Sequence, residues 1–147
     1  MKIAFACDQG GYEQKAELIS FLDDQGIEVL DFGIDSAESV DYPELAREVA
    51  GAVAKGDADY GILVCGTGIG MSLAANKVRG IRCANLVSSE FAKLAKAHND
   101  ANIISLSGRF ISPSKNKRII KTFLDTEHEG GRHSRRVAKI MDIEREK

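Results

Sequence analysis

Short apolar runs alternate with amphipathic stretches along almost the whole chain. The apolar runs are bounded by glycine and polar residues, as buried strands usually are, and the expected strands are 3–7, 27–32, 60–65, 81–87 and 102–106. Between and after them apolar residues recur at helical spacing, and the expected helices are 12–25, 43–55, 70–77, 89–97 and 112–124. The pattern therefore predicts strands that alternate regularly with helices.

This alternation predicts the fold class. Strands that are each followed by a helix pair in parallel through right-handed crossovers, and their helices cover both faces of the sheet. We therefore expect an α/β fold, a three-layer α/β/α sandwich with a five-stranded parallel, Rossmann-like sheet. A charged tail with a glycine pair, 126–147, follows and ends in a further helix. With 147 residues the chain fits one domain, 1–147, and is too short for two ordinary ones.

The loops after the first and third strands are the expected binding region. In doubly wound sheets, ligands bind beyond the carboxyl ends of the strands, where the strand order reverses. If the first and third strands are neighbours, the loops 7–11 and 65–70 face each other across one crevice. The glycines in both loops let the backbone approach a ligand closely.

Composition narrows the choice of partner and compartment. The 20 Lys and Arg residues against 22 Asp and Glu give a net charge of -2, which favours neither nucleic acid nor a membrane surface as a partner. A small molecule or another protein is expected instead. The amino terminus turns polar too soon for a signal peptide, and no apolar run is long enough to span a membrane, so we expect a cytoplasmic protein. The three cysteines lack a Cys-x-x-Cys spacing, which favours reduced thiols over disulfides or a zinc site.

The glycine-rich loop "CGTGIG" at 65–70 has several interpretations. Its glycine spacing is one residue shorter than the dinucleotide-binding fingerprint, and the chain has no Gly-Lys-Ser/Thr phosphate loop. Three glycines also suit a tight turn from strand to helix. Cys65 ends its strand directly below the start of a helix, where a thiolate is favoured, so reactive and structural roles both remain open. Cys7 and Cys83 lie within apolar strands and are expected to be small buried side chains.

Four separated segments together resemble one family. They are "SVDYPELA" at 39–46, "GILVCGTGIGMSLAANKVRGIRCA" at 61–84, "HNDANI" at 98–103 and "EGGRHSRRV" at 129–137. The chain closely resembles the type B ribose-5-phosphate isomerases, a family that also includes allose-6-phosphate and galactose-6-phosphate isomerases. The similarity covers nearly the whole chain, and several motifs in the right order are more specific than a glycine pattern.

The resemblance implies an aldose–ketose isomerase that interconverts ribose 5-phosphate and ribulose 5-phosphate through a cis-enediolate. Cys65 matches the catalytic base of the family, and Thr67 would help to pass a proton between two substrate oxygens. The backbone N–H groups of the loop would hold the negative oxygen of the intermediate, and such donors contribute ~3 kcal/mol each. The substrate-binding residues expected in the loop are Gly66, Gly68, Ile69 and Gly70.

The resemblance also assigns sugar-contacting roles outside this loop. His98 and Asn99 match the residues that bind the sugar and open its ring, although a histidine at a helix end is more often a capping or surface group. Asp8 matches a position beside the sugar and is counted with His98 among the catalytic residues. Tyr42 matches a substrate-binding position, against the simpler interpretation of a half-buried loop aromatic.

Three arginines are the expected phosphate-binding residues. Arg132 and Arg136 are four residues apart in the tail helix and so share one face, as a phosphate clamp needs, although a solvated basic face would look the same. Arg109 matches a further phosphate-binding position of the family.

At one position the chain departs from the family pattern. The family usually has Asp-His after the first strand, whereas this chain has Asp8-Gln9. Glutamine donates a hydrogen bond to a sugar or phosphate but cannot carry a proton, so Gln9 is expected to bind substrate while the identity of the natural sugar phosphate stays open. Met71 stands where some members carry a carboxylate base, which leaves Cys65 as the only candidate base in the loop.

No cofactor and no metal site are expected. The reaction of the family needs neither, and His128 and His133, although flanked by Glu127 and Glu129, have no standard metal-ligand spacing.

The expected assembly also comes from the resemblance. It implies a homodimer, or a dimer of dimers, with shared active sites in which the His98 segment of one chain meets the Cys65 loop of the other. Two alternatives remain: an isomerase of another aldose phosphate (allose 6-phosphate, galactose 6-phosphate or a four-carbon sugar phosphate), and a non-catalytic nucleotide-binding α/β module.

Overall fold

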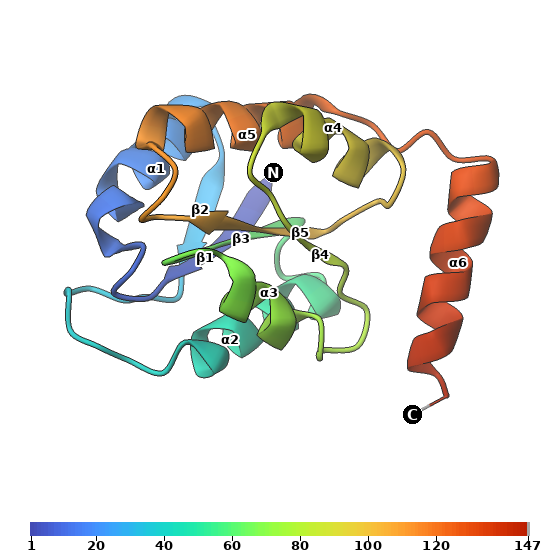
Figure 1. Ribbon diagram of the computed structural model, residues 1–147, viewed down its shortest axis with the longest axis horizontal. Helices are drawn as coiled ribbons and strands as arrows, with labels where there is room; N and C mark the ends of the chain where they lie inside the picture. The colour runs from blue at the N-terminus through green and yellow to red at the C-terminus, as the bar shows by residue number, and fades with distance from the viewer. Residues whose placement is uncertain (147) are drawn as a thin grey trace.

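The computed structural model describes residues 1–146 and has an α/β fold (Figure 1). Its strands are β1 (Lys2–Cys7), β2 (Glu28–Asp31), β3 (Tyr60–Cys65), β4 (Cys83–Asn85) and β5 (Ile103–Ser107). Its helices are α1 (Tyr12–Asp24), α2 (Tyr42–Lys55), α3 (Ile69–Ala75), α4 (Ser89–Ala97), α5 (Pro113–Asp125) and α6 (Arg132–Glu144). Residue 147, the last of the expected tail, lies outside the described residues, and the single domain over 1–147 remains a prediction.

The five strands form one parallel sheet in the order β2-β1-β3-β5-β4. Helices α1, α4 and α5 cover one face, and α2 and α3 cover the other, which confirms the expected three-layer sandwich (Figure 1). Strands β1 and β3 are neighbours, as the binding-region argument required. The fourth strand is shorter than expected, because the N–H of Arg82 donates to the side chain of Asn102.

Alternation along β1 assigns its side chains to two cores. Ile3 and Phe5 pack into the cluster beneath α1, α4 and α5, whereas Ala4 and Ala6 pack with the alanines of α2. Small side chains on this second face let α2 lie close to the sheet, and a Cβ at Gly61 would come within 2.7 Å of Val49. The chain enters α2 from the loop that follows β2, so the amino terminus of α2 lies at the carboxyl edge of the parallel sheet.

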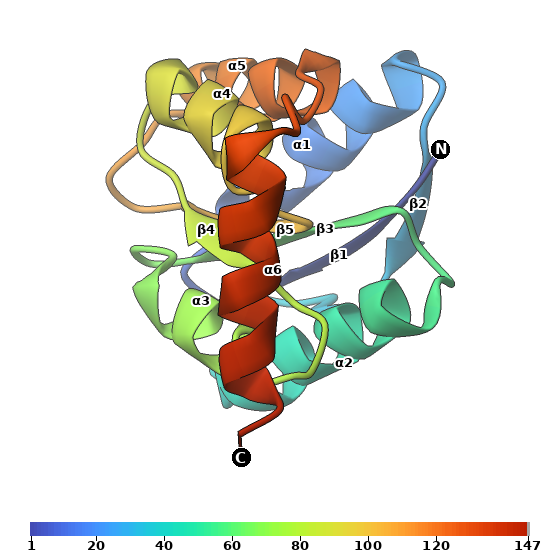
Figure 2. The ribbon, with the colours of Figure 1, turned by 90° about the vertical axis from the view of Figure 1, so that its right-hand side faces the viewer.

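The tail helix α6 lies beside the β4 edge of the sheet, apart from the two helical layers (Figures 1 and 2). The carboxylate of Glu144 accepts hydrogen bonds from the N–H of Gly80 at 2.9 and 3.1 Å, and Val137 is buried. Ile140 and Ile143 of the same helix remain exposed. Within residues 1–146, no helix is both long enough and apolar enough to cross a membrane.

Candidate active site

The loop that follows β3 is anchored through its carbonyl groups. Ser107 Oγ donates to Gly66 O at 2.6 Å, and Ser105 Oγ donates to Gly68 O at 2.7 Å. Between them, the side-chain amide of Asn85 donates to Thr67 O at 3.3 Å. The C=O and N–H of one trans peptide point in opposite directions, so each anchored carbonyl also fixes the direction of the next N–H. Two of these N–H groups donate within the loop, that of Gly68 to Cys65 Sγ and that of Ile69 to Thr67 Oγ1.

Cys65 lies at the base of this loop. Its side chain is buried, and its Sγ accepts the N–H of Gly68 at 3.1 Å. Thr67 Oγ1 accepts the N–H of Ile69 at 3.1 Å, so the threonine hydroxyl is held on the same loop. The structure therefore provides a thiol with a backbone donor directed at its sulfur.

The other two cysteines have different surroundings. Burial raises the pKa of the Cys7 thiol to about 11, and burial likewise raises the pKa of Cys83 to about 11. Both stay protonated at neutral pH and are therefore poor nucleophiles and bases. This agrees with the structural role that the sequence predicts for them.

The loop after β1 packs directly against the Cys65 loop. A Cβ at Gly10 would lie only 2.5 Å from the backbone nitrogen of Gly66, so the two loops touch in a way that only glycine permits. Asp8 is buried, and its Oδ1 accepts the N–H of Gly10 at 2.8 Å. The predicted meeting of loops 7–11 and 65–70 is confirmed.

Tyr42 and Arg109 flank the same loop. A Cβ at Gly70 would lie 2.6 Å from the ring of Tyr42, which is the first residue of α2. A Cβ at Gly66 would lie 3.1 Å from a guanidinium nitrogen of Arg109. The phenol and the guanidinium thus both border the glycine-rich backbone.

Gln9 uses its side chain to hold a neighbouring loop. Its Oε1 accepts the N–H of Val40 at 3.1 Å and so ties the loop after β1 to the polar segment that leads into α2. The sequence predicted that Gln9 binds substrate, and the structure adds that its carbonyl oxygen has a partner within the chain.

The remaining predicted residues lie at the opposite edge of the sheet. In the β3–β5 register Cys65 is paired with Ser107, whereas β5 begins four residues earlier at Ile103, ~13 Å away at 3.3 Å per residue. His98 caps the carboxyl end of α4, and Asn99 follows it, before the start of β5. One chain therefore does not bring His98 and Asn99 to the Cys65 loop.

Arg132 and Arg136 belong to this second group. Both are exposed at the start of α6, which is joined to the end of α4 by a hydrogen bond from the N–H of Glu129 to Ala97 O at 2.9 Å. The arginine pair lies beside His98, while Arg109 lies beside Cys65. The predicted phosphate-binding arginines are thus divided between the two edges of the sheet.

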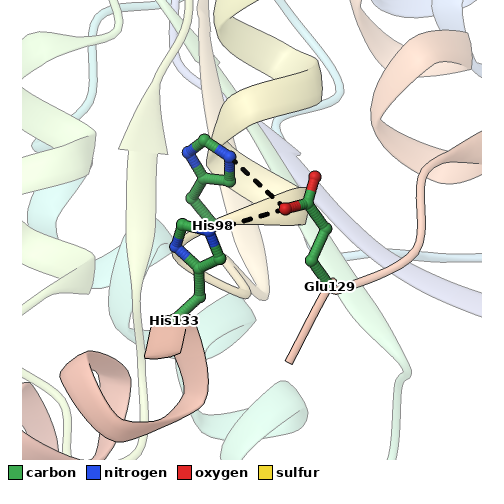
Figure 3. Close-up of side chains that lie close together, drawn as sticks. All are labelled: His98, Glu129 and His133. Carbon is green, nitrogen blue, oxygen red and sulfur yellow. Dashed lines mark ion pairs between the residues drawn. The ribbon is translucent and has the colours of Figure 1, made fainter. Parts of the chain in front are cut away.

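His98, Glu129 and His133 form a cluster that the sequence did not predict (Figure 3). The Nε2 atoms of His98 and His133 lie 3.7 and 3.5 Å from the same Oε1 of Glu129. The two imidazole rings are stacked, with centroids 4.0 Å apart and planes 5° from parallel. The sequence did hold a signal for this cluster, because Glu129 and His133 are four residues apart, a spacing that brings side chains together on a helix. The sequence analysis instead considered His133 together with His128.

Three ligand atoms this close together could serve a metal ion. The ring planes argue against that use, because lone pairs on stacked, nearly parallel imidazoles lie in separate planes and do not converge on one point. An ion held by both histidines would require the stack to open.

Comparison with known proteins places the chain in a family. The model of the ribose/galactose isomerase family matches residues 3–140. The chain belongs to this family. It is 45% identical to ribose-5-phosphate isomerase B of Escherichia coli, over 97% of this chain and 96% of that protein.

Solved structures of similar proteins agree with the fold. The ribose-5-phosphate isomerase B of Clostridium thermocellum has a TM-score of 0.98 and 48% identity, with 99% of each chain covered. The enzyme of Mycoplasma genitalium with bound ribulose 5-phosphate has a TM-score of 0.95 and 42% identity, over 99% of this chain and 97% of that one.

Proposed function

We propose that this protein is an aldose–ketose isomerase that interconverts ribose 5-phosphate and ribulose 5-phosphate. The observation that carries the proposal is Cys65, a buried thiol with the Gly68 N–H directed at its sulfur, in a glycine-rich loop whose carbonyls are anchored by Ser105 and Ser107. Family relatives that act on this substrate, one of them solved with ribulose 5-phosphate, support the choice.

The isomerisation moves two protons and leaves no net charge. The Cys65 thiolate removes the proton from C2 of the open-chain aldose, and the electron pair passes through a cis-enediolate to the C1 oxygen. Backbone N–H groups of the loop that do not donate within the chain stabilise that oxygen, at ~3 kcal/mol for each well-placed donor. The thiol then protonates C1, while Thr67 carries a proton from the C2 oxygen to the C1 oxygen, which yields the ketose.

The second group of residues completes the site from another copy of the chain. His98, Asn99, Arg132 and Arg136 lie at the opposite sheet edge from Cys65, so a homodimer with shared sites unites them, and such dimers could pair further. Large apolar side chains left exposed on the single chain support a buried interface between copies. They include Leu73, Phe91 and Phe110.

In the proposed dimer the arginines bind the phosphate and His98 opens the sugar ring. Arg132 and Arg136 share one face of α6 and form charge-assisted hydrogen bonds to the dianion, with Arg109 as a further contact. Asp8, Gln9 and Tyr42 contact the sugar. No metal or cofactor takes part. Three free cysteines suit a reducing compartment, and we infer the cytoplasm.

A panel of aldose phosphates with four to six carbons, each coupled to detection of its ketose, tests the proposal. We expect ribose 5-phosphate to have the highest kcat/KM and the Cys65→Ala variant to lose that activity. Faster turnover of a four-carbon or six-carbon aldose phosphate would replace the substrate assignment. Absence of turnover with every sugar, together with nucleotide binding, would favour the non-catalytic module.

A further inference from the structure

Arg109 depends on its backbone for its position beside the Cys65 loop. Its side chain is exposed, and within residues 1–146 no hydrogen bond or ion pair holds the guanidinium. A Cβ at Gly66 would nevertheless lie 3.1 Å from one of the guanidinium nitrogens. An arginine without a side-chain partner in its own chain is directed by the loop that carries it. The groups that fix the loop 107–111 therefore determine where Arg109 can meet a phosphate.

The backbone of the Cys65 loop holds one side of this segment. The N–H of Gly108 donates to Cys65 O at 2.8 Å, and the N–H of Arg109 donates to Gly66 O at 3.2 Å. These two N–H groups belong to the two successive peptides that lead into Arg109. The carbonyls of the same peptides point the opposite way, because the C=O and N–H of a trans peptide do so. They therefore need donors on the other side of the segment.

Two buried side-chain amides supply those donors. Asn116 Nδ2 donates to Ser107 O at 2.9 Å, and Gln14 Nε2 donates to Gly108 O at 3.1 Å. Gln14 Nε2 also donates to Ile111 O at 2.7 Å, while its Oε1 accepts from Asn116 Nδ2 at 2.9 Å. Gln14 belongs to α1 and Asn116 to α5, two helices on the same face of the sheet (Figure 1). The peptides on either side of Gly108 are thus held at both of their polar groups.

Asn116 holds the segment at a cost in stability. Its side chain is fully buried, and within the described residues its Oδ1 has no hydrogen-bond partner. A buried polar atom without a partner destabilises a fold. The opposite orientation of the amide would place Oδ1 against the carbonyl of Ser107, so Nδ2 must stay there. Stability given up in this way is typical of residues that serve a functional site.

We propose that Gln14 and Asn116 are positioning residues for phosphate binding, which hold the loop 107–111 so that the guanidinium of Arg109 meets the phosphate of the substrate. This inference rests on the proposed function, because that function makes Arg109 a phosphate contact. Both amides are buried behind the loop and act through Arg109 without touching the substrate. A planar guanidinium binds phosphate oxygens well only in a narrow range of directions, so a tilt of the peptide before it weakens the contact.

Direct binding of inorganic phosphate tests this role without any turnover. Calorimetric titration gives its Kd for the full-length protein as wild type, Gln14→Met, Asn116→Leu and Arg109→Ala, and for each amide substitution combined with Arg109→Ala. Methionine and leucine are close in size to the amides that they replace but donate no hydrogen bond, and either variant alone is sufficient should the other not fold. Ile119→Val is the matched control, because Ile119 is fully buried in the apolar core beneath the same helix as Asn116.

We expect Arg109→Ala to raise the phosphate Kd at least about tenfold, and Gln14→Met and Asn116→Leu each at least about fivefold, because a charge-assisted contact is lost or misdirected. The KM for ribose 5-phosphate rises by the same factor while kcat stays within about twofold, since the phosphate is bound equally in the ground and transition states. Added to Arg109→Ala, neither amide substitution weakens binding by more than about a further twofold, because its effect passes through the missing arginine. Ile119→Val lowers thermal stability and leaves the Kd unaffected.

Losses that add in full to that of Arg109→Ala would mean that Gln14 and Asn116 only maintain structure, and an unchanged Kd in their variants would mean that they do not direct Arg109. Either result overturns the inference and leaves the proposed function standing. A wild type without measurable phosphate affinity, or an unchanged Kd in Arg109→Ala, also overturns it. A wild type that binds phosphate but does not convert ribose 5-phosphate refutes the proposed function instead, and the Kd values still decide the inference.

Discussion

Replacing Cys65 by alanine separates the chemistry of the loop from its structure. The substitution removes a buried sulfur that accepts one hydrogen bond, from the Gly68 N–H at 3.1 Å. Losing that contact costs about 1 kcal/mol of folding free energy. The carbonyls of Gly66, Thr67 and Gly68 keep their partners from β4 and β5, so the loop retains its shape.

The effect of Cys65→Ala on catalysis is much larger. Removing a general base lowers kcat about 100-fold or more, which corresponds to ~2.7 kcal/mol in the activation barrier. The assay follows formation of ribulose 5-phosphate at saturating ribose 5-phosphate, with circular dichroism and thermal unfolding to verify the fold. Cys83→Ala is the matched control, because its protonated thiol takes no part in the chemistry.

A folded Cys65→Ala variant that keeps more than about a tenth of the wild-type kcat would refute the assignment of Cys65 as the base. A large loss of activity in Cys83→Ala would show that a structural disturbance of this face of the sheet is enough to abolish turnover. The loss in Cys65→Ala could then not be assigned to removal of the base.

Four further predictions concern the rest of the site. Arg132→Ala combined with Arg136→Ala raises KM for phosphorylated sugars far more than for neutral sugars, and equal losses would reject the clamp. Gly68→Ala lowers the free energy of unfolding by about 1–2 kcal/mol in denaturant titrations, because Gly68 has a φ of 85° and a Cβ would lie 2.3 Å from the Asn85 amide; an unchanged stability would contradict this. Gln9→His changes kcat/KM on ribose 5-phosphate by less than about tenfold, ~1.4 kcal/mol, and a hundredfold gain would indicate that the native substrate does not need ring opening. Dialysis against EDTA leaves turnover within about twofold, and a loss restored by added Zn²⁺ would overturn the metal-free mechanism.

The fold was predictable because its signals are local. A five-residue apolar run followed by an amphipathic helix is visible within a short window, and such units have few ways to assemble. The exception, β4, is an edge strand, and its start depends on a distant side chain, because the N–H of Arg82 donates to the side chain of Asn102. No periodicity within 81–87 carries that information.

The candidate site was predictable only in part, for a similar reason. The meeting of the loops 7–11 and 65–70 follows from strand order, which the fold class limits to a few choices. The groups that orient the glycine loop are Ser105, Ser107 and Asn85, and they look like ordinary polar residues of a strand until the register places them beneath it. Glu129 was likewise visible as an exposed acidic residue, but its relation to His98 depends on how the tail folds back onto α4.

The division of the site between two sheet edges has a physical advantage in the proposed dimer. The loop around Cys65 directs the Gly68 N–H at the sulfur, whereas Nε2 of His98 lies 3.7 Å from the carboxylate of Glu129. If both lay side by side in one chain, Glu129 would oppose formation of the thiolate and the enediolate. With each group held in its own surroundings, the proposed contact between copies brings together His98, the arginines and the loop.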